Sequence, residues 1–121
     1  MDEPVLLTGA VGRVGQAILR HIGTDYEWRL LDRAPMSSSK RPEGIDADDI
    51  YIGDVTDADD VREAIDGCRA VVHLAGDPRP EAPWDSVLAN NIDGTQNVLS
   101  AAVDAGVERV VFASSNHTVK H

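Results

Sequence analysis

Three glycines at every third position, Gly9, Gly12 and Gly15, form the most informative chemical pattern in the chain. They follow a short apolar run at 5–7 and precede a segment whose apolar residues repeat at helical spacing. In such a strand–turn–helix, glycine lets the backbone approach a pyrophosphate closely, and the N–H groups that begin the helix face the phosphates. The pattern therefore predicts a phosphate-binding turn. The alternative is a glycine-rich connection that binds nothing.

Two aspartates follow the next two apolar runs and could bind the rest of a nucleotide. Asp32 lies close to the offset of about 20 residues from the glycine turn at which an acidic residue binds a ribose. Its carboxylate would accept hydrogen bonds from ribose hydroxyls and repel a 2′-phosphate, which favours NAD over NADP. Arg33 beside it could blunt this preference or lie against the adenine. Asp54 could accept a hydrogen bond from the adenine amino group or only hold its own turn, and Asp32 could be a solvated or capping residue.

Polar residues also follow the last apolar run. Ser114, Ser115, Asn116 and His117 come directly after 109–113. Hydroxyls at the end of a strand can polarise a substrate oxygen while a base elsewhere takes the proton. The alternative is a polar cap on the strand. His73 lies within an apolar run, so we expect a hydrogen-bonded core histidine.

The apolar runs predict strands at 5–7, 28–32, 50–52, 70–75 and 109–113, and a loop at 33–49. Helices are expected at 16–22, from Thr56 to near Gly67, and at 84–105 with Gly106 as the stop. In the last helix the residues expected to face the core are Leu88, Ile92, Val98, Leu99, Ala102 and Val103. With right-handed crossovers, this alternation predicts an α/β Rossmann fold, an open doubly wound parallel sheet in strand order 3-2-1-4-5.

Length and composition set the remaining bounds. The 121 residues suit one domain, 1–121, and 42% of them are hydrophobic. A formal net charge of −10 argues against nucleic acid or an anionic membrane as partner. The 21 acidic residues, fifteen of them aspartate, and only two lysines are typical of proteins adapted to high salt. The start of the chain lacks the layout of a signal peptide, so a cytoplasmic location is expected. Cys68 is expected to be a buried apolar residue, and no metal site is predicted.

Taken together, the motifs resemble the extended short-chain dehydrogenase/reductase superfamily, the NAD-dependent epimerase/dehydratase group. The motifs that carry the resemblance are TGAVGRVG at 8–15, LLDR at 30–33, GDVTD at 53–57, VVHLAG at 71–76, NNIDGTQNVL at 90–99 and RVVFASSNHTV at 109–119. Within the superfamily, the SSNH run is similar to the uronate dehydrogenases. The segment 76–96 together with FASSNH is more similar to the NAD-dependent glucose-6-phosphate dehydrogenases of halophilic archaea.

The resemblance implies a role for each matching residue. The cofactor-binding residues would be Gly9, Gly12, Arg13, Val14, Gly15, Asp32, Arg33, Asp54, Val55, Leu74, Ala75 and Gly76. Ser115 would be the catalytic serine, with Ser114 as the adjacent candidate and Asn91 organising the site. Asn116 and His117 would contact the sugar, and Arg79 is the one candidate for a sugar phosphate in its loop. Related enzymes pair through the helix expected at 84–105, so a homodimer is implied.

The resemblance also exposes a departure. The base of the superfamily is a tyrosine in a Tyr-x-x-x-Lys turn, and neither Tyr26 nor Tyr51 has lysine at the fourth position after it. We therefore expect the N-terminal portion of the family fold, without its C-terminal part, which binds NAD without turnover. In the complete enzyme the C1 hydroxyl of a cyclic sugar would be oxidised to a lactone. The substrate could be glucose 6-phosphate, a uronate or a nucleotide sugar. The alternative to an enzyme is a non-catalytic dinucleotide-sensing module.

Overall fold

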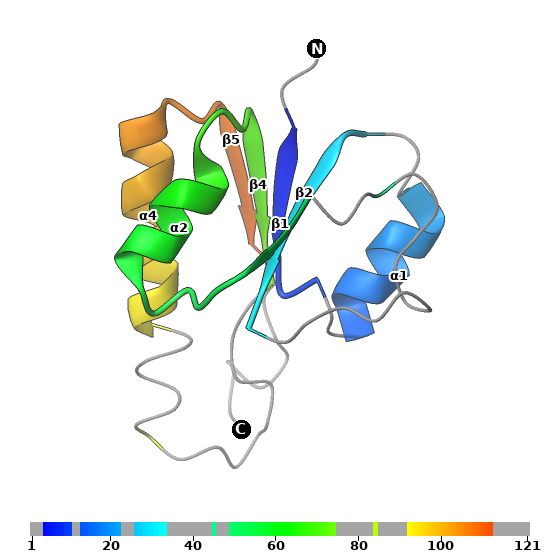
Figure 1. Ribbon diagram of the computed structural model, residues 1–121, viewed down its shortest axis with the longest axis horizontal. Coiled ribbons are helices and arrows are strands. Elements are labelled where there is room, and N and C mark those ends of the chain that lie inside the picture. Colours follow the sequence, from blue (N-terminus) through cyan, green and yellow to red (C-terminus); the bar gives the residue numbers. More distant parts are fainter. Residues whose placement is uncertain are drawn as a thin grey trace, which may run out of the picture.

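A computed structural model of the chain describes residues 4–10, 13–22, 26–33, 45, 49–74, 84 and 92–112. These residues form three layers, with one parallel sheet between helices (Figure 1). Helix α1 (Arg13–Ile22) covers one face, and α2 (Ala58–Ile65) and α4 (Gly94–Ala105) lie side by side on the other.

The sheet has the predicted strand order. It runs β3-β2-β1-β4-β5 with every neighbouring pair parallel. The strands are β1 (Val5–Thr8), β2 (Trp28–Asp32), β3 (Ile50–Ile52), β4 (Ala70–His73) and β5 (Arg109–Phe112). The apolar runs at the centre of the sheet form β1 and β2, which are buried because helices cover both faces there. The predicted α/β Rossmann topology is therefore confirmed.

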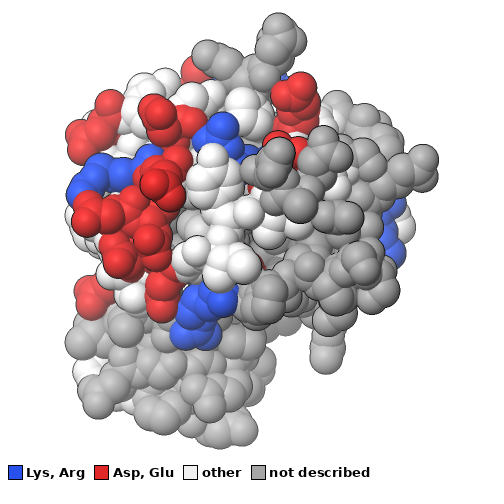
Figure 2. Space-filling view, viewed as in Figure 1, with Lys and Arg blue, Asp and Glu red and all other residues white. Residues whose placement is uncertain are grey.

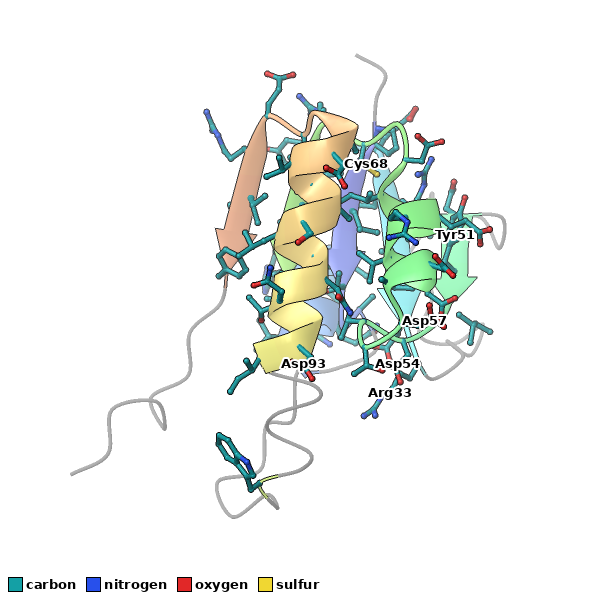
Figure 3. All side chains as sticks on the ribbon, turned by 90° about the vertical axis from the view of Figure 1, so that its left-hand side faces the viewer. Arg33, Tyr51, Asp54, Asp57, Cys68 and Asp93 are labelled. Atoms are coloured by element: carbon teal, nitrogen blue, oxygen red, sulfur yellow. The ribbon has the colours of Figure 1, made fainter. Side chains whose placement is uncertain are left out.

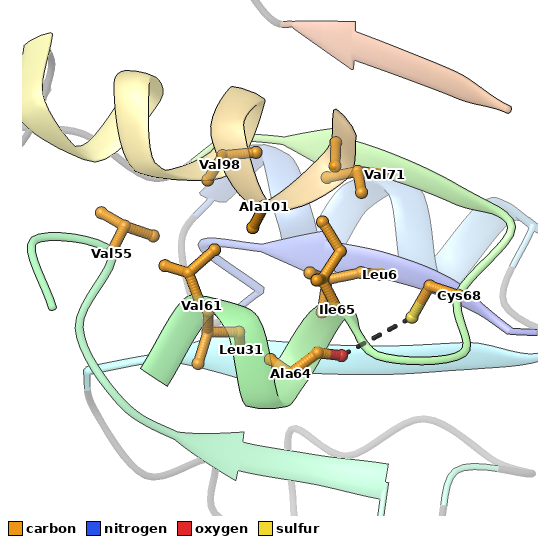
Figure 4. Close-up of a cluster of buried hydrophobic side chains, with 11 residues drawn as sticks. Leu6, Leu31, Val55, Val61, Ala64, Ile65, Cys68, Val71, Val98 and Ala101 are labelled. Atoms are coloured by element: carbon orange, nitrogen blue, oxygen red, sulfur yellow. Dashed lines mark hydrogen bonds between the residues drawn. The ribbon is translucent and has the colours of Figure 1, made fainter. Parts of the chain in front are cut away.

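Two clusters of buried side chains, one on each face, hold the layers together. Leu6 and Leu31 point toward α2 and α4, where they pack with Val61, Val71 and Val98 (Figure 4). Their neighbours along the strands point the other way and pack against α1, in a cluster that contains Val5, Leu7, Leu19, Trp28 and Leu30. This alternation along each strand follows from the two-residue period of extended backbone. Cys68 belongs to the first cluster, as expected, and its thiol donates to the Ala64 carbonyl at 3.6 Å.

The ends of the helices follow local chemistry. The cap of α2 is Asp57, one residue later than the predicted Thr56, because its Oδ1 accepts from the N–H groups of Asp59 and Asp60 at 2.9 and 3.3 Å. Helix α4 ends as predicted at Gly106, which has a left-handed φ of 74°. The Gly106 and Val107 N–H groups then donate to carbonyls of the last turn.

The predicted inward face of α4 is wrong for three residues. Ile92, Leu99 and Val103 are 48%, 40% and 79% exposed. The inward residues are Gly94, Val98, Ala101 and Ala102, whose spacing of four, three and one follows a helical stripe. This helix carries apolar side chains on two sides, so its composition alone did not select the side that packs. The predicted part of the helix at 85–91 lies outside the described residues.

Acidic side chains gather over α2 (Figure 2). They come from Asp57, Asp59, Asp60, Glu63 and Asp66, and the one basic residue within the helix, Arg62, pairs with Asp59. Like charges at this spacing repel one another, and dissolved salt screens the repulsion. In the described ranges, no helix has both the length and the apolar character needed to cross a membrane.

We expect the melting temperature to rise in about 2 M KCl, by roughly 5 °C over dilute buffer, because salt screens the repulsion over α2. Calorimetric or circular dichroism melts measure this. The double variant Glu63→Gln with Asp66→Asn, which removes two exposed charges, should melt higher than the wild type in dilute buffer and gain less from KCl. A wild-type melting temperature that does not change with KCl would contradict the prediction.

Candidate functional site

The carboxyl ends of the central strands form a row at one edge of the sheet. Three backbone hydrogen bonds extend the strand pairing past the strand ends: Gly9 N to Leu31 O at 2.8 Å, Gly53 N to Asp32 O at 3.0 Å and Leu74 N to Thr8 O at 3.2 Å. The glycine turn, the end of β2, the loop after β3 and the end of β4 are therefore neighbours. This is the edge at which open α/β sheets bind ligands.

Two of the three glycines of the turn, Gly9 and Gly15, lie within the described residues. Gly9 has a φ of 73°, a left-handed conformation that glycine adopts without strain. Gly15 lies in α1 so close to the turn that a Cβ there would meet the Gly9 carbonyl oxygen at 2.6 Å and the Ala10 oxygen at 2.8 Å. The Gln16 amide also donates to Ala10 O at 2.9 Å. Glycine at position 15 thus brings the start of α1 against the turn, and Val14 is exposed beside it.

Asp32 and Arg33 end β2 at this same edge. Asp32 is half-buried and Arg33 is exposed. Asp32 lies next to the glycine turn because the preceding residue, Leu31, accepts from Gly9 N. Figure 3 shows Arg33 at the same end of the molecule as Asp54 and Asp93, with Cys68 at the opposite end. The structure thus brings the predicted ribose-binding carboxylate beside the predicted phosphate-binding turn.

The loop after β3 is held by its own side chains. Asp54 Oδ1 accepts from Thr56 N at 2.9 Å, so this carboxylate holds its own turn, which was one of the two roles predicted for it. In the described part of the chain its Oδ2 has no hydrogen-bond partner. Val55 is buried in the core, so only its main chain is presented to a ligand at this edge.

His73 is the hydrogen-bonded core histidine that the sequence predicts. Its Nδ1 lies 2.7 Å from Thr8 Oγ1 and its Nε2 lies 3.2 Å from Thr95 Oγ1. Thr8 Oγ1 also accepts from Leu74 N at 3.0 Å. The ring meets Phe112 edge-on at 5.8 Å. Burial lowers the pKa of His73 below its ordinary value of 6.5, so the imidazole is neutral and connects β1, β4 and α4.

Sequence reasoning missed the polar residues that join these parts: Thr8, Asp60, Thr95 and Asn97. Asp60 Oδ2 accepts from Asp54 N at 3.0 Å, and Asn97 Nδ2 donates to Val55 O at 2.8 Å. The available signal was weak. Asn97 is a poor helix former directly before the buried Val98, an arrangement that suggests a specific hydrogen bond.

Several predicted site residues lie outside the described residues, and their roles stay predictions. They are Gly12, Ala75, Gly76, Arg79, Asn91, Ser114, Ser115, Asn116 and His117, and the side chain of Arg13. Strand β5 ends at Phe112, which pairs with His73 of β4. Among the described residues, no group of His, Cys, Asp and Glu is arranged to hold a metal ion.

A model of the NAD dependent epimerase/dehydratase family matches residues 5–120. The chain belongs to this family. The NAD-dependent glucose-6-phosphate dehydrogenase of Haloferax volcanii is 68% identical over 119 residues, which cover 98% of this chain and 45% of that protein. The L-arabinose 1-dehydrogenase (NAD(P)(+)) of the same organism is 43% identical over 113 residues, with 93% of this chain and 41% of that protein covered.

Solved structures of the family have the same fold. The crystal structure of a uronate dehydrogenase mutant from Agrobacterium tumefaciens complexed with NAD matches with a TM-score of 0.82 and 35% identity, over 97% of this chain and 42% of that one. A UDP-glucose 4-epimerase from Thermus thermophilus, complexed with NAD, matches with a TM-score of 0.78 and 26% identity, over 93% of this chain and 37% of that one. The chain thus spans less than half the length of these relatives. The predicted adaptation to high salt fits the similarity to proteins of Haloferax volcanii.

The epimerase/dehydratase family is NAD dependent by its description, so the predicted cofactor is confirmed at the level of the family. The described residues fit a dinucleotide. The left-handed Gly9 and the close start of α1 suit a pyrophosphate, and Asp32 beside them suits a ribose.

We expect stability to fall below about pH 6.5, because His73 is neutral when folded and the unfolded chain takes up the proton first. The contribution of His73 to the free energy of unfolding is fully present above the pKa that His73 has in the unfolded chain. It is lost as the pH falls toward the pKa in the folded chain, at up to about 1.4 kcal/mol per pH unit. Urea unfolding at several pH values of the wild type and of His73→Asn measures the difference between the two slopes.

The comparison with His73→Asn cancels the effect of the acidic surface, because the wild type and the variant share that surface. Protonation of the acidic surface relieves its repulsion, so its effect on stability has the opposite sign to that of His73. His21→Asn, on the exposed part of α1, controls for loss of an imidazole elsewhere. Equal pH slopes for the wild type and His73→Asn would contradict the prediction.

Proposed function

We propose that this chain is the NAD-binding half of a dehydrogenase that oxidises the C1 hydroxyl of a cyclic sugar to a lactone, with glucose 6-phosphate as the sugar. The observation that carries the proposal is the row in which the glycine turn, Asp32 and Gly53 are neighbours. The choice of sugar is supported by the 68% identity to the glucose-6-phosphate dehydrogenase, since the L-arabinose relative shares 43% and the uronate dehydrogenase of Pseudomonas syringae 37%.

Each part of the row is proposed to hold one part of the dinucleotide. The turn from Gly9 to Gly15 would bind the pyrophosphate, and Asp32 would accept from the adenine ribose. Asp54 Oδ2 and the main chain of Val55 would meet the adenine, and 74–76 would pass the nicotinamide ribose. When bound, NAD supplies the hydride acceptor that the oxidation requires.

The substrate side rests on the resemblance alone. Ser115, with Ser114 as the adjacent candidate, would polarise the sugar oxygen, and Asn91 would organise the site. Asn116, His117 and Arg79 would contact the sugar. A base must take the hydroxyl proton as the hydride leaves, and no Tyr-x-x-x-Lys occurs within the 121 residues. These residues by themselves are therefore proposed to bind NAD without turnover.

A pairing of two copies through α4 is part of the proposal. It is supported by the exposed apolar side chains of Leu99 and Val103 on this helix and of Ile92 just before it. Apolar side chains grouped on one exposed face are typical of surfaces that bind another protein.

We expect NAD to bind more tightly than NADP. Asp32→Asn should lower the affinity for NAD by about tenfold, because the charged hydrogen bonds to the ribose are lost. It should also reduce the difference in affinity between NAD and NADP, because the repulsion of the 2′-phosphate is lost. Isothermal titration calorimetry measures both ligands. Asp66→Asn, an exposed carboxylate in the α2–β4 connection, is the matched control. Unchanged NAD affinity in Asp32→Asn would refute the ribose role, and NADH formed from glucose 6-phosphate by the 121 residues would refute the absence of turnover.

We expect light scattering to give the mass of a dimer for the wild type and of a monomer for Val103→Asp, because a buried unpaired charge would oppose the pairing of α4. The control is Ile52→Asp, which places the same charge at a 65% exposed apolar residue of β3. A monomeric wild type, or a dimer that withstands Val103→Asp, would contradict the pairing.

A further inference from the structure

Asn97 links two segments that are far apart in the sequence. Its side-chain amide leaves α4 and donates from Nδ2 to the main-chain carbonyl of Val55, at 2.8 Å and across 42 residues. The bond is partly buried. Val55 follows β3 at the edge of the sheet where Asp32 and the glycine turn also lie, so the bond ends in the candidate site.

The other bonds that hold this loop come from the loop itself, from α2 and, through Gly53 N, from Asp32 O at the end of β2. Asp54 N donates to Asp60 Oδ2 at 3.0 Å, Thr56 N donates to Asp54 Oδ1 at 2.9 Å, and Asp57 N donates to Asp54 O at 2.9 Å. Among the hydrogen bonds of the described residues, Asn97 provides the tie between this loop and α4. It therefore adds a directional bond to the packing of Val55 in the buried cluster that contains Val98.

The side chain of Val55 packs beneath the loop, while its main chain takes part in the hydrogen bond from Asn97. Val55 points into the core between Val61 of α2 and Val98 of α4 (Figure 4), so its side chain is anchored from below. A buried valine side chain alone leaves its peptide plane free to rotate about the anchored atoms. The Val55 carbonyl and the Thr56 N–H belong to one peptide plane, in which the carbonyl accepts from Asn97 and the N–H donates to Asp54 Oδ1. Asn97 thus ties this plane to α4. The main chain of Val55 is the part of this residue that a ligand at the edge can reach.

Helix α4 is hydrogen-bonded to two parts of the same edge, the end of β4 and the loop after β3. Two residues before Asn97, Thr95 lies 3.2 Å from His73 Nε2 at the end of β4. One helix thus connects the end of β4 with the loop after β3. A helix is rigid over this short distance, so the two parts keep their spacing.

We propose that Asn97 is a positioning residue for the adenine end of the dinucleotide site: it orients the Val55 main chain and touches no ligand itself. The proposal rests on the proposed function, in which Asp54 and Val55 receive the adenine. It follows that removal of the Asn97 donor loosens the loop and weakens the binding of an adenine nucleotide. The binding of a nicotinamide nucleotide is unaffected.

The matched pair of variants is Asn97→Asp and Gln96→Glu. Each replaces an amide by a carboxylate on the same helix, so the added charge is the same. Gln96 is exposed and its amide contacts Ser100 Oγ at 3.3 Å, one turn along the same helix. Asn97→Ala removes the donor without adding charge and serves if Asn97→Asp does not fold. Asn97→Gln keeps an amide and tests for rescue.

Two measurements test whether Asn97 positions the loop. Amide hydrogen exchange by NMR, without ligand, should show protection of the Thr56 and Asp57 N–H groups falling about tenfold in Asn97→Asp and Asn97→Ala and staying unchanged in Gln96→Glu. Calorimetry should show 5′-AMP binding about tenfold more weakly in the same two variants, with nicotinamide mononucleotide unchanged. Asn97→Gln should recover part of both.

Unchanged protection of the loop in Asn97→Asp and Asn97→Ala would overturn the proposal, as would an equal loss of affinity for both mononucleotides. If the wild type binds neither 5′-AMP nor NAD, the proposed function fails on that result alone. The exchange measurement on the ligand-free chain then still decides whether Asn97 orients the loop.

Discussion

The hydrogen-bond register of β1 with its two neighbours is the constraint on which the site depends. Strand β1 lies between β2 and β4, and the pairing continues past the strand ends through Gly9 N to Leu31 O and Leu74 N to Thr8 O. A slip of one residue would turn Leu6 and its neighbours to the opposite faces and disrupt both buried clusters. The same burial that stabilises the sheet therefore also sets which residues meet at its carboxyl edge.

Polar side chains inside this apolar sheet are tolerated because each has a partner. No buried side-chain nitrogen or oxygen of the described residues lacks a hydrogen bond. His73 bonds Thr8 and Thr95, and Asn97 bonds the carbonyl of Val55. A buried polar group without a partner costs about 1–3 kcal/mol, so these pairs hold α4 in one position over the sheet. The result is a site whose parts are spaced by the core rather than by loops alone.

Patterns within one element were read correctly where one physical requirement dominated. Gly9 and Gly106 have left-handed φ values, as turns and helix ends demand, and the strand order follows from alternating runs with right-handed crossovers. The errors came where two nearby residues satisfy the same local rule. Thr56 and Asp57 are both good caps, and the geometry of the loop selected Asp57. Helix α4 has apolar residues on two sides, and only the packing on α2 and β4 selected Val98 and Ala102 over Leu99 and Val103.

The sequence by itself determined the elements, their order, the glycine turn and the position of Asp32 after β2, because these depend on spacing within a short stretch. The tertiary structure alone decided that His73 bonds Thr95 and that Asn97 reaches Val55. The physical reason is that a hydrogen bond between residues 22 or 42 positions apart leaves no periodic pattern in either segment. It exists only once the core has brought the two segments together.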